Sequence, residues 1–171
     1  MDLKDKITKI RLILLDVDGV LTDESLRYAP DGEEIKIFNV KDGLGIKLAQ
    51  AAGLAIGIIS SRSSQAVNRR AHELGIEVVY QGYKKKIEAY NQIKKELFVS
   101  DELIAYIGDD LPDLEILKEV GFAIAVENGC EEVKKVVDFI TNKPGGRGAV
   151  RDVIEMILRE QGKWEQVVTA F

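Results

Sequence analysis

Short, continuously apolar stretches alternate along the chain with longer segments that have the three-to-four residue spacing of amphipathic helices. The apolar stretches cover residues 10–15, 55–59, 78–80, 103–107, 122–126 and 138–140. The helical segments cover residues 43–53, 62–74, 85–97, 112–120, 130–137 and 147–160. Apolar strands separated by helices are typical of a parallel sheet covered on both faces. The pattern therefore predicts an α/β fold.

Two stretches depart from this alternation. Residues 25–40 read as two strands around the turn sequence Pro-Asp-Gly at 30–32, which predicts a β-hairpin insertion at about residues 23–40. The glycine-rich stretch 145–148 predicts a flexible elbow before the last helix.

Length and composition fit one globular domain, expected over residues 1–171 with a C-terminal tail at about 161–171. The 46% hydrophobic content excludes a disordered chain, and the formal net charge of −5 leaves no basic excess for binding nucleic acid. Cys130, the lone cysteine, cannot form an internal disulfide. The apolar run 12–15 ends at Asp16, too early for a signal peptide or a membrane span. We therefore expect a cytoplasmic protein.

Acidic residues follow two of the predicted strands. Asp16 and Asp18 come where the first strand ends, and Asp109 and Asp110 follow the fourth, with Asp113 close behind. Ligands of open parallel sheets bind beyond the carboxyl ends of the strands, so these carboxylates are expected to meet there. Their mutual repulsion favours a hard cation with oxygen ligands, Mg²⁺ above all. Helix capping stays an alternative for Asp110 and Asp113.

The other strand ends supply complementary chemistry. Ser60 follows the second strand at the predicted start of a helix, where a hydroxyl and free N–H groups favour an anion. Lys86 opens the helix after the third strand. A metal, a hydroxyl, an ammonium and carboxylates together describe a phosphoryl-transfer site. Competing motifs fail: no GxxxxGK[ST] segment occurs, Gly43-Leu44-Gly45 lacks the third glycine of a dinucleotide fingerprint, and the residues after Asp16 do not continue as a calcium loop.

These residues resemble, in order, the four motifs of the haloacid dehalogenase superfamily of phosphohydrolases: DVDGVLT at 16–22, Ser60, Lys86 and GDD at 108–110. Three further segments resemble the 3-deoxy-D-manno-octulosonate (KDO) 8-phosphate phosphatases within it: FNVKDGLG at 38–45, YQG at 80–82 and GGRGAVR at 145–151. The resemblance implies a Rossmann-like parallel sheet with helices on both faces, a haloacid dehalogenase core without a cap domain.

The resemblance also implies a role for each motif residue. Asp16 attacks phosphorus to form an aspartyl-phosphate, while Asp18 protonates the leaving sugar oxygen and later activates water. Mg²⁺ is held by Asp16, the backbone carbonyl of Asp18 and Asp109. Ser60 and Lys86 hold the phosphoryl oxygens.

Substrate-contacting positions follow from the same resemblance. They are Asp18, Asn39, Val40, Lys41, Asp42, Gly43, Lys47, Arg62, Arg70 and Lys86. Arg62 and Arg70 are predicted to share one helix face, and arginine forks suit the carboxylate of a sugar acid. An ordinary solvated helix face stays an alternative for Lys47 and Arg70. Lys41 and Lys47 stand where the family pattern leads us to expect arginine.

The intervals between the motifs leave no room for a cap domain. The family resemblance implies instead a homotetramer, in which neighbouring subunits cover the site and exclude water. We assign the hairpin and the glycine-rich stretch to that assembly. Arg147 is expected either to reach a neighbour's substrate or to cap the last helix.

The sequence thus predicts a Mg²⁺-dependent phosphatase that converts KDO 8-phosphate into the free sugar acid and phosphate, a step in the synthesis of lipopolysaccharide precursors. Phosphatase activity on the 9-phosphate of a nine-carbon sialic or deaminated sialic acid is the nearest alternative, and Arg62 argues against it. A non-catalytic scaffold of the same fold is a further alternative. The catalytic motif residues are all present, which disfavours it.

Overall fold

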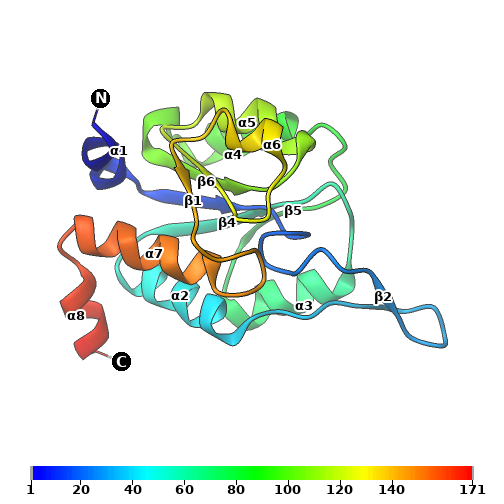
Figure 1. Ribbon diagram of the computed structural model, residues 1–171. Helices are drawn as coiled ribbons and strands as arrows, with labels where there is room; N and C mark the ends of the chain where they lie inside the picture. Colours follow the sequence, from blue (N-terminus) through cyan, green and yellow to red (C-terminus); the bar gives the residue numbers. More distant parts are fainter. Residues whose placement is uncertain (1, 171) are drawn as a thin grey trace.

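A parallel sheet of six strands forms the centre of the computed structural model, which describes residues 2–170 (Figure 1). The strand order is β5-β4-β1-β6-β7-β8. The strands are β1 (Leu12–Leu15), β4 (Ala55–Ile59), β5 (Val78–Tyr80), β6 (Ile104–Gly108), β7 (Phe122–Ala125) and β8 (Phe139–Ile140). In register, Leu12 of β1 pairs with Ala55 of β4 and with Ile104 of β6. The predicted α/β fold is confirmed.

Helices cover both faces of this sheet. They are α1 (Leu3–Lys9), α2 (Val40–Ala51), α3 (Gln65–Leu74), α4 (Lys86–Leu97), α5 (Leu114–Glu119), α6 (Glu131–Lys134), α7 (Ala149–Glu160) and α8 (Trp164–Thr169), with 3₁₀ turns η1 (Asp101–Leu103) and η2 (Leu111–Asp113). Figure 1 shows α2, α3 and α7 on one face and α4, α5 and α6 on the other. No helix within residues 2–170 is long and apolar enough to cross a bilayer.

Strand β1 shows why the apolar runs are continuous. Ile13 and Leu15 belong to the apolar core beneath α2, α3 and α7, whereas Leu12 and Leu14 belong to the core on the opposite face. Successive side chains of a strand point to opposite faces, so a strand covered on both sides is apolar at every position.

The insertion between β1 and α2 is the predicted hairpin, formed by β2 (Arg27–Tyr28) and β3 (Glu34–Ile35) as an antiparallel pair. The Gly32 N–H donates to the Ala29 carbonyl at 2.8 Å, and Gly32 has a φ of +87°, which closes the turn. Figure 1 shows the hairpin projecting from the body of the molecule.

Helix boundaries differ from the sequence expectation in two places that bear on the site. Helix α3 begins at Gln65 rather than at residue 62, because residues 60–64 form a loop after β4. Helix α2 begins at Val40 rather than at 43, because the Asn39 side chain caps it.

Two helices were not expected from the sequence. The charged amino-terminal segment forms α1, which is anchored by the buried side chain of Ile7. The tail forms α8, whose Trp164 ring lies 5.5 Å from the Arg151 guanidinium carbon and 4.7 Å from that of Arg159. Stacking of arginine on an indole ring stabilises such a docked helix.

Candidate active site

A cleft of about 220 Å³ opens at the carboxyl ends of β1, β4 and β6. Its walls are Asp16, Asp18, Ser60, Ser61, Arg62, Lys86, Asp109, Asp110, Pro112 and Asp113. These residues come from four separate stretches of sequence, which the parallel topology brings to one edge of the sheet. The expected meeting of the acidic clusters with Ser60, Arg62 and Lys86 therefore occurs.

Lys86 lies between two carboxylates. Its ammonium Nζ is 2.7 Å from Asp16 Oδ1 and 2.7 Å from Asp113 Oδ1, and the residue is 3% exposed. Burial alone would lower the pKa of Lys86, but the charges of Asp16 and Asp113 outweigh it and raise that pKa. The first turn of α4 therefore delivers a permanent positive charge to the end of β1.

Asp113 organises the turn that follows β6. Its Oδ2 accepts hydrogen bonds from the backbone N–H groups of Asp109 (2.9 Å) and Asp110 (3.3 Å), and its Oδ1 accepts one from the Tyr106 hydroxyl (2.6 Å). Asp110 is the N-cap of η2 and forms a capping box with Asp113. The capping alternative is thus confirmed for Asp110, while Asp113 is both a helix-start residue and part of the cleft.

The carboxylates of Asp16, Asp109 and Asp113 offer ligand atoms that all lie within 4.8 Å of one another. Asp109 Oδ1 is buried and has no hydrogen-bond partner within residues 2–170. Both oxygens of Asp113 already accept hydrogen bonds, so Asp16 and Asp109 are the carboxylates with capacity for a cation. Hard oxygen ligands crowded around an orphaned carboxylate oxygen fit Mg²⁺.

The pKa values of this acidic cluster reflect the same crowding. Burial, followed by the charge of Asp113, raises the pKa of Asp16 to about 6 despite the nearby Lys86. Burial and the charge of Asp16 raise the pKa of Asp109 well above its usual range. A bound divalent cation would oppose both causes, because its charge favours the ionised form of the buried carboxylates and screens their mutual repulsion.

Gly19 makes the close approach of the two acidic strand ends possible. Its φ is +94°, and a Cβ at this position would lie 2.1 Å from Asp109 Oδ2. A side chain would therefore displace either the loop after β1 or the Asp109 carboxylate.

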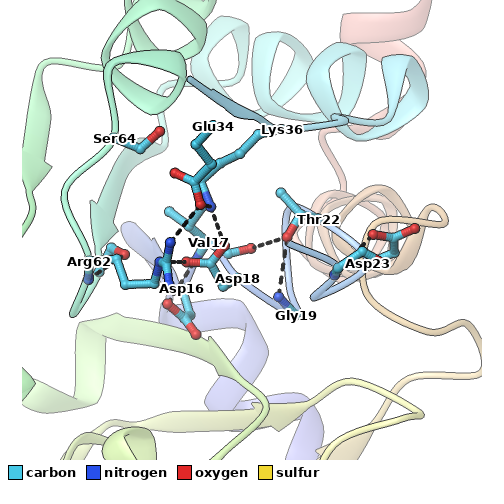
Figure 2. A network of polar contacts seen from close by, with 12 residues as sticks. Asp16, Val17, Asp18, Gly19, Thr22, Asp23, Glu34, Lys36, Arg62 and Ser64 are labelled. Atoms are coloured by element: carbon cyan, nitrogen blue, oxygen red, sulfur yellow. Dashed lines mark hydrogen bonds and ion pairs between the residues drawn. The ribbon is translucent and has the colours of Figure 1, made fainter. Parts of the chain in front are cut away.

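Asp18 is held by basic side chains, as Figure 2 shows. Its Oδ1 forms a short ion pair with the Lys36 ammonium, and its Oδ2 lies 3.8 Å from Arg62 Nε. Glu34 bridges the two bases, at 3.3 Å from Lys36 Nζ and 2.7 Å from Arg62 Nη2. Burial works to raise the pKa of Glu34, but its hydrogen bond to Lys36 and the two positive charges lower it overall.

Lys36 and Glu34 were not expected at the site from the sequence. They belong to the hairpin, and charged residues on a short strand carry no periodic signal that would place them. Only the docking of the hairpin against the loop after β1 brings them to Asp18 (Figure 2).

Ser60 lies directly after β4, and its surroundings differ from the expectation. Its backbone N–H donates to the Tyr80 carbonyl (2.8 Å), and its Oγ accepts from the Arg62 N–H (3.3 Å). The expected helix N-terminus at Ser60 is wrong, because α3 starts only at Gln65. Ser61, which sequence analysis did not assign to the site, lines the cleft with a buried hydroxyl that has no partner within residues 2–170.

Arg62 and Arg70 do not share a helix face, contrary to the expectation. Arg62 lies in the loop before α3, whereas Arg70 lies within that helix. The Arg70 guanidinium is 6.0 Å from the centre of the Phe38 ring, and a Cβ on Gly43 would come within 2.2 Å of its Nη2. Arg70 therefore packs against the start of α2 and not into the cleft.

The remaining predicted substrate positions also lie outside the walls of the cleft, around the start of α2. Asn39 accepts hydrogen bonds from the N–H groups of Lys41 (2.8 Å) and Asp42 (3.3 Å), and Val40 is 81% exposed. The buried Asp42 carboxylate accepts from the N–H groups of Gly148 (3.3 Å) and Arg151 (2.9 Å) and so caps α7.

Lys47 points away from this group. Its Nζ would be 3.6 Å from a Cβ on Gly75, which forms the C-cap of α3. An ammonium at a helix C-terminus interacts favourably with the helix dipole. A structural contact at the end of α3 accounts for its position.

The glycine-rich stretch is not a flexible elbow. The Gly146 N–H donates to the Val20 carbonyl (2.8 Å), and a Cβ on Gly145 would lie 1.6 Å from the carbonyl oxygen of Gly19. Arg147 forms an ion pair with Asp23 at 3.4 Å. The stretch therefore braces the loop that carries Asp18, within the same subunit.

Comparisons with known proteins agree with this geometry. A family model described as haloacid dehalogenase-like hydrolase matches residues 77–154. The 3-deoxy-D-manno-octulosonate 8-phosphate phosphatase of Escherichia coli is 39% identical over 165 residues, which cover 96% of this chain and 88% of that protein.

Solved structures give the same result. The phosphatase of that name from Moraxella catarrhalis, in complex with a magnesium ion, a phosphate ion and KDO, superposes with a TM-score of 0.95 at 45% identity, covering 98% of this chain and 97% of that one. The cobalt-bound Haemophilus influenzae enzyme has a TM-score of 0.91 at 39% identity, covering 96% and 99%. This chain therefore belongs to the 3-deoxy-D-manno-octulosonate 8-phosphate phosphatase family of haloacid dehalogenase-like hydrolases.

Proposed function

We propose that this chain is a Mg²⁺-dependent phosphatase that hydrolyses KDO 8-phosphate to KDO and inorganic phosphate. The observation that carries the proposal is the buried Asp16 carboxylate at the end of β1, with the Lys86 ammonium at 2.7 Å. Beside it lies the Asp109 carboxylate, whose Oδ1 has no hydrogen-bond partner among residues 2–170. Relatives of the same family carry this activity in their names, and one was solved with magnesium, phosphate and KDO bound.

In the first step, a carboxylate oxygen of Asp16 attacks phosphorus. The bond from phosphorus to the sugar oxygen breaks as the new bond to Asp16 forms, and Asp18 gives its proton to the leaving oxygen. The product is a phosphorylated Asp16 and the free sugar acid.

In the second step, Asp18 accepts a proton from a water molecule, whose oxygen attacks phosphorus. The bond between phosphorus and Asp16 breaks, and inorganic phosphate leaves with Asp18 protonated for the next cycle. Lys86 and Ser60 hold the phosphoryl oxygens through both steps. Positioning and charge stabilisation dominate this kind of reaction.

Asp16, Asp109 and the backbone carbonyl of Asp18 are the groups that would hold Mg²⁺. Once bound, the cation supplies positive charge to the phosphoryl oxygens and favours the ionised form of the Asp16 carboxylate.

Arg62 is the residue of the cleft whose guanidinium can bind the substrate carboxylate through two N–H groups. Glu34 already contacts one end of this guanidinium, at 2.7 Å from Nη2. The other positions taken from the family resemblance do not line this cleft, and their contact with the substrate stays a prediction. They are Asn39, Val40, Lys41, Asp42, Gly43, Lys47 and Arg70.

We also infer a homotetramer in which a neighbouring copy covers the open cleft. Exposed apolar side chains on and beside the hairpin support this: Leu26, Tyr28, Ile35, Ile37 and Val40. The cytoplasmic location, the single domain over residues 1–171 and the reach of Arg147 toward a neighbouring subunit stay predictions.

A substrate panel tests the proposed function. Phosphate release is measured from KDO 8-phosphate and from a nine-carbon sialic acid 9-phosphate, each with Mg²⁺ and with a chelator. We expect Mg²⁺-dependent release with clear preference for the eight-carbon substrate. Preference for the nine-carbon phosphate would overturn the substrate assignment, and no release from any phosphate ester by the folded protein would favour the scaffold.

A further inference from the structure

Lys36 is a buried lysine that lies directly after β3 of the hairpin and ends at Asp18 (Figure 2). Its side chain is 2% exposed, and its ammonium pairs with Asp18 Oδ1 and, at 3.3 Å, with Glu34 Oε1. A buried ammonium without a partner is strongly destabilising, so these two carboxylates fix its position.

Asp18 itself has room to move. Its side chain is 23% exposed and stands at the mouth of the cleft, on the loop after β1. A carboxyl group in such a place can rotate between several orientations unless a partner fixes one of them. Lys36 supplies that partner at Oδ1, which leaves Oδ2 toward the cleft side, 3.8 Å from Arg62 Nε.

Arg62 is the weaker of the two bases as a support for Asp18. Its side chain is 44% exposed, its contact with Asp18 is longer, and its closest carboxylate is Glu34 at 2.7 Å. It is also the group with a fork for a substrate carboxylate. The buried Lys36 is the partner that can stay in place through the catalytic cycle.

We propose that Lys36 is a positioning residue for Asp18. Its ammonium holds Oδ1 and thereby sets the plane of the carboxyl group, so that Oδ2 carries the proton given to the leaving oxygen and later taken from water. Glu34 keeps the ammonium in place from the other side. This inference rests on the role of Asp18 in the proposed function, and it makes the hairpin a part of the catalytic machinery.

Leaving-group dependence separates this role from a merely structural one. A sugar or alkyl oxygen needs a proton to leave, whereas a dinitrophenolate does not. Because kcat/KM reports the steps up to the first irreversible one, transfer of the phosphoryl group from dinitrophenyl phosphate to Asp16 should not need a well-placed Asp18.

The experiment compares the wild type with Lys36→Met and Lys36→Arg, with Glu33→Gln as a matched control in the same hairpin. Glu33 is exposed and lies outside the cleft. We expect Lys36→Met to lower kcat/KM for KDO 8-phosphate about 10²-fold and for dinitrophenyl phosphate only about 2- to 3-fold. Lys36→Arg should recover part of the loss, and Glu33→Gln should match the wild type on both substrates.

Equal losses on the two substrates, or no loss on either, would overturn the positioning role. If Lys36→Met does not fold by circular dichroism, Glu34→Gln keeps the proposal testable. Glu34→Gln should show a smaller loss with the same selectivity for the poor leaving group, and an equal loss on both substrates would contradict the proposal. A wild type that cleaves dinitrophenyl phosphate but not KDO 8-phosphate would refute only the proposed substrate. Glycerol phosphate then replaces KDO 8-phosphate as the poor leaving group, and the same comparison decides on Lys36.

Discussion

At the scale of single residues, the acidic cluster at the end of β1 and β6 destabilises the metal-free protein. Asp16, Asp109 and Asp113 lie together in one buried site, and the Lys86 ammonium pairs with two of them, Asp16 and Asp113. Like charges in a poorly hydrated site raise the free energy of the folded state. A site of this kind is maintained for binding a cation and an anion and not for stability.

Asp109→Asn tests this conflict between stability and function. It removes a carboxyl group that ionises in the unfolded chain but must be protonated or buried as a charge in the folded metal-free protein, so the free energy of unfolding of that form should rise by about 1 kcal/mol or more. The stabilisation by added Mg²⁺ should disappear, and phosphatase activity should fall at least about 10²-fold. Chemical denaturation with and without Mg²⁺ measures both effects, and Asp5→Asn on the exposed face of α1 is the control. A variant that is less stable without metal, or still stabilised by Mg²⁺, would contradict the assignment.

The raised pKa values of Asp16 and Asp109 predict how the free energy of unfolding changes with pH. The folded metal-free protein keeps protons on Asp16 and Asp109 that the unfolded chain releases above about pH 4. The contribution of Asp16 to the free energy of unfolding therefore falls as the pH rises from about 4 through about 6, and that of Asp109 continues to fall above pH 6. Mg²⁺ competes with those protons, so its effect on Tm should be larger at pH 8 than at pH 5. Thermal unfolding at the two pH values is the measurement, and an Mg²⁺ effect that is larger at pH 5 would contradict this reasoning.

At the scale of elements, the glycine-rich stretch before α7 fixes the loop after β1. Gly145 lies so close to Gly19 that no side chain fits between the two backbones. The glycines thus serve close packing and not flexibility, and a change here reaches Asp18 through the backbone.

Gly145→Ala tests that packing. Its methyl group must displace the Gly19 carbonyl, so we expect a loss of about 2 kcal/mol or more in the free energy of unfolding and a fall in kcat. Gly162→Ala is the matched control, since its Cβ meets open space and only the positive φ of 67° opposes it, for about 1 kcal/mol. Denaturant titration of both variants gives the comparison, and equal losses would show that the contact with Gly19 is unimportant.

The elements also show how far the sequence could be interpreted. Strands β4 and β5 match their predicted ranges, because a strand covered on both faces leaves a continuous apolar run. Helices α1 and α8 are only seven and six residues long, so their formation depends on tertiary packing that periodicity does not reveal.

The residues of the site also fall into those that the sequence could place and those that it could not. Asp16 and Asp109 could be placed because topology alone brings strand ends together. Lys36 and Glu34 could not, because their place depends on how a short hairpin docks. Arg62 was misplaced because the predicted helix began three residues too early, within the serine-rich loop 60–64 that precedes α3. The local sequence pattern predicts helices and strands, whereas the contacts of an inserted hairpin depend on tertiary packing.

At the scale of the whole molecule, the open cleft and the exposed hairpin both bear on whether copies of this chain assemble. Tyr28 and Ile37 are 60% and 48% exposed, which is unusual for large apolar side chains grouped on one insertion. A second copy packing there would cover the cleft without a cap domain.

Tyr28→Glu with Ile37→Glu tests the assembly. The inferred tetramer should dissociate, because a charge buried at an interface is strongly unfavourable. Sedimentation velocity of the wild type and the double variant measures the subunit number. Phe98→Glu is the control, since Phe98 is 95% exposed at the end of α4, away from the hairpin. A monomeric wild type, or a double variant with unchanged sedimentation, would refute this surface as the interface.

The central claim, that the Asp16 carboxylate becomes phosphorylated, is tested most directly by trapping the intermediate. Protein quenched in acid during turnover is reduced with borohydride, and the modified residue is located by mass spectrometry. The account predicts modification at Asp16 in the wild type, and none in Asp16→Asn, which should also release no phosphate. Full phosphate release by Asp16→Asn, or reduction of the carboxyl group of another aspartate or glutamate instead, would contradict it.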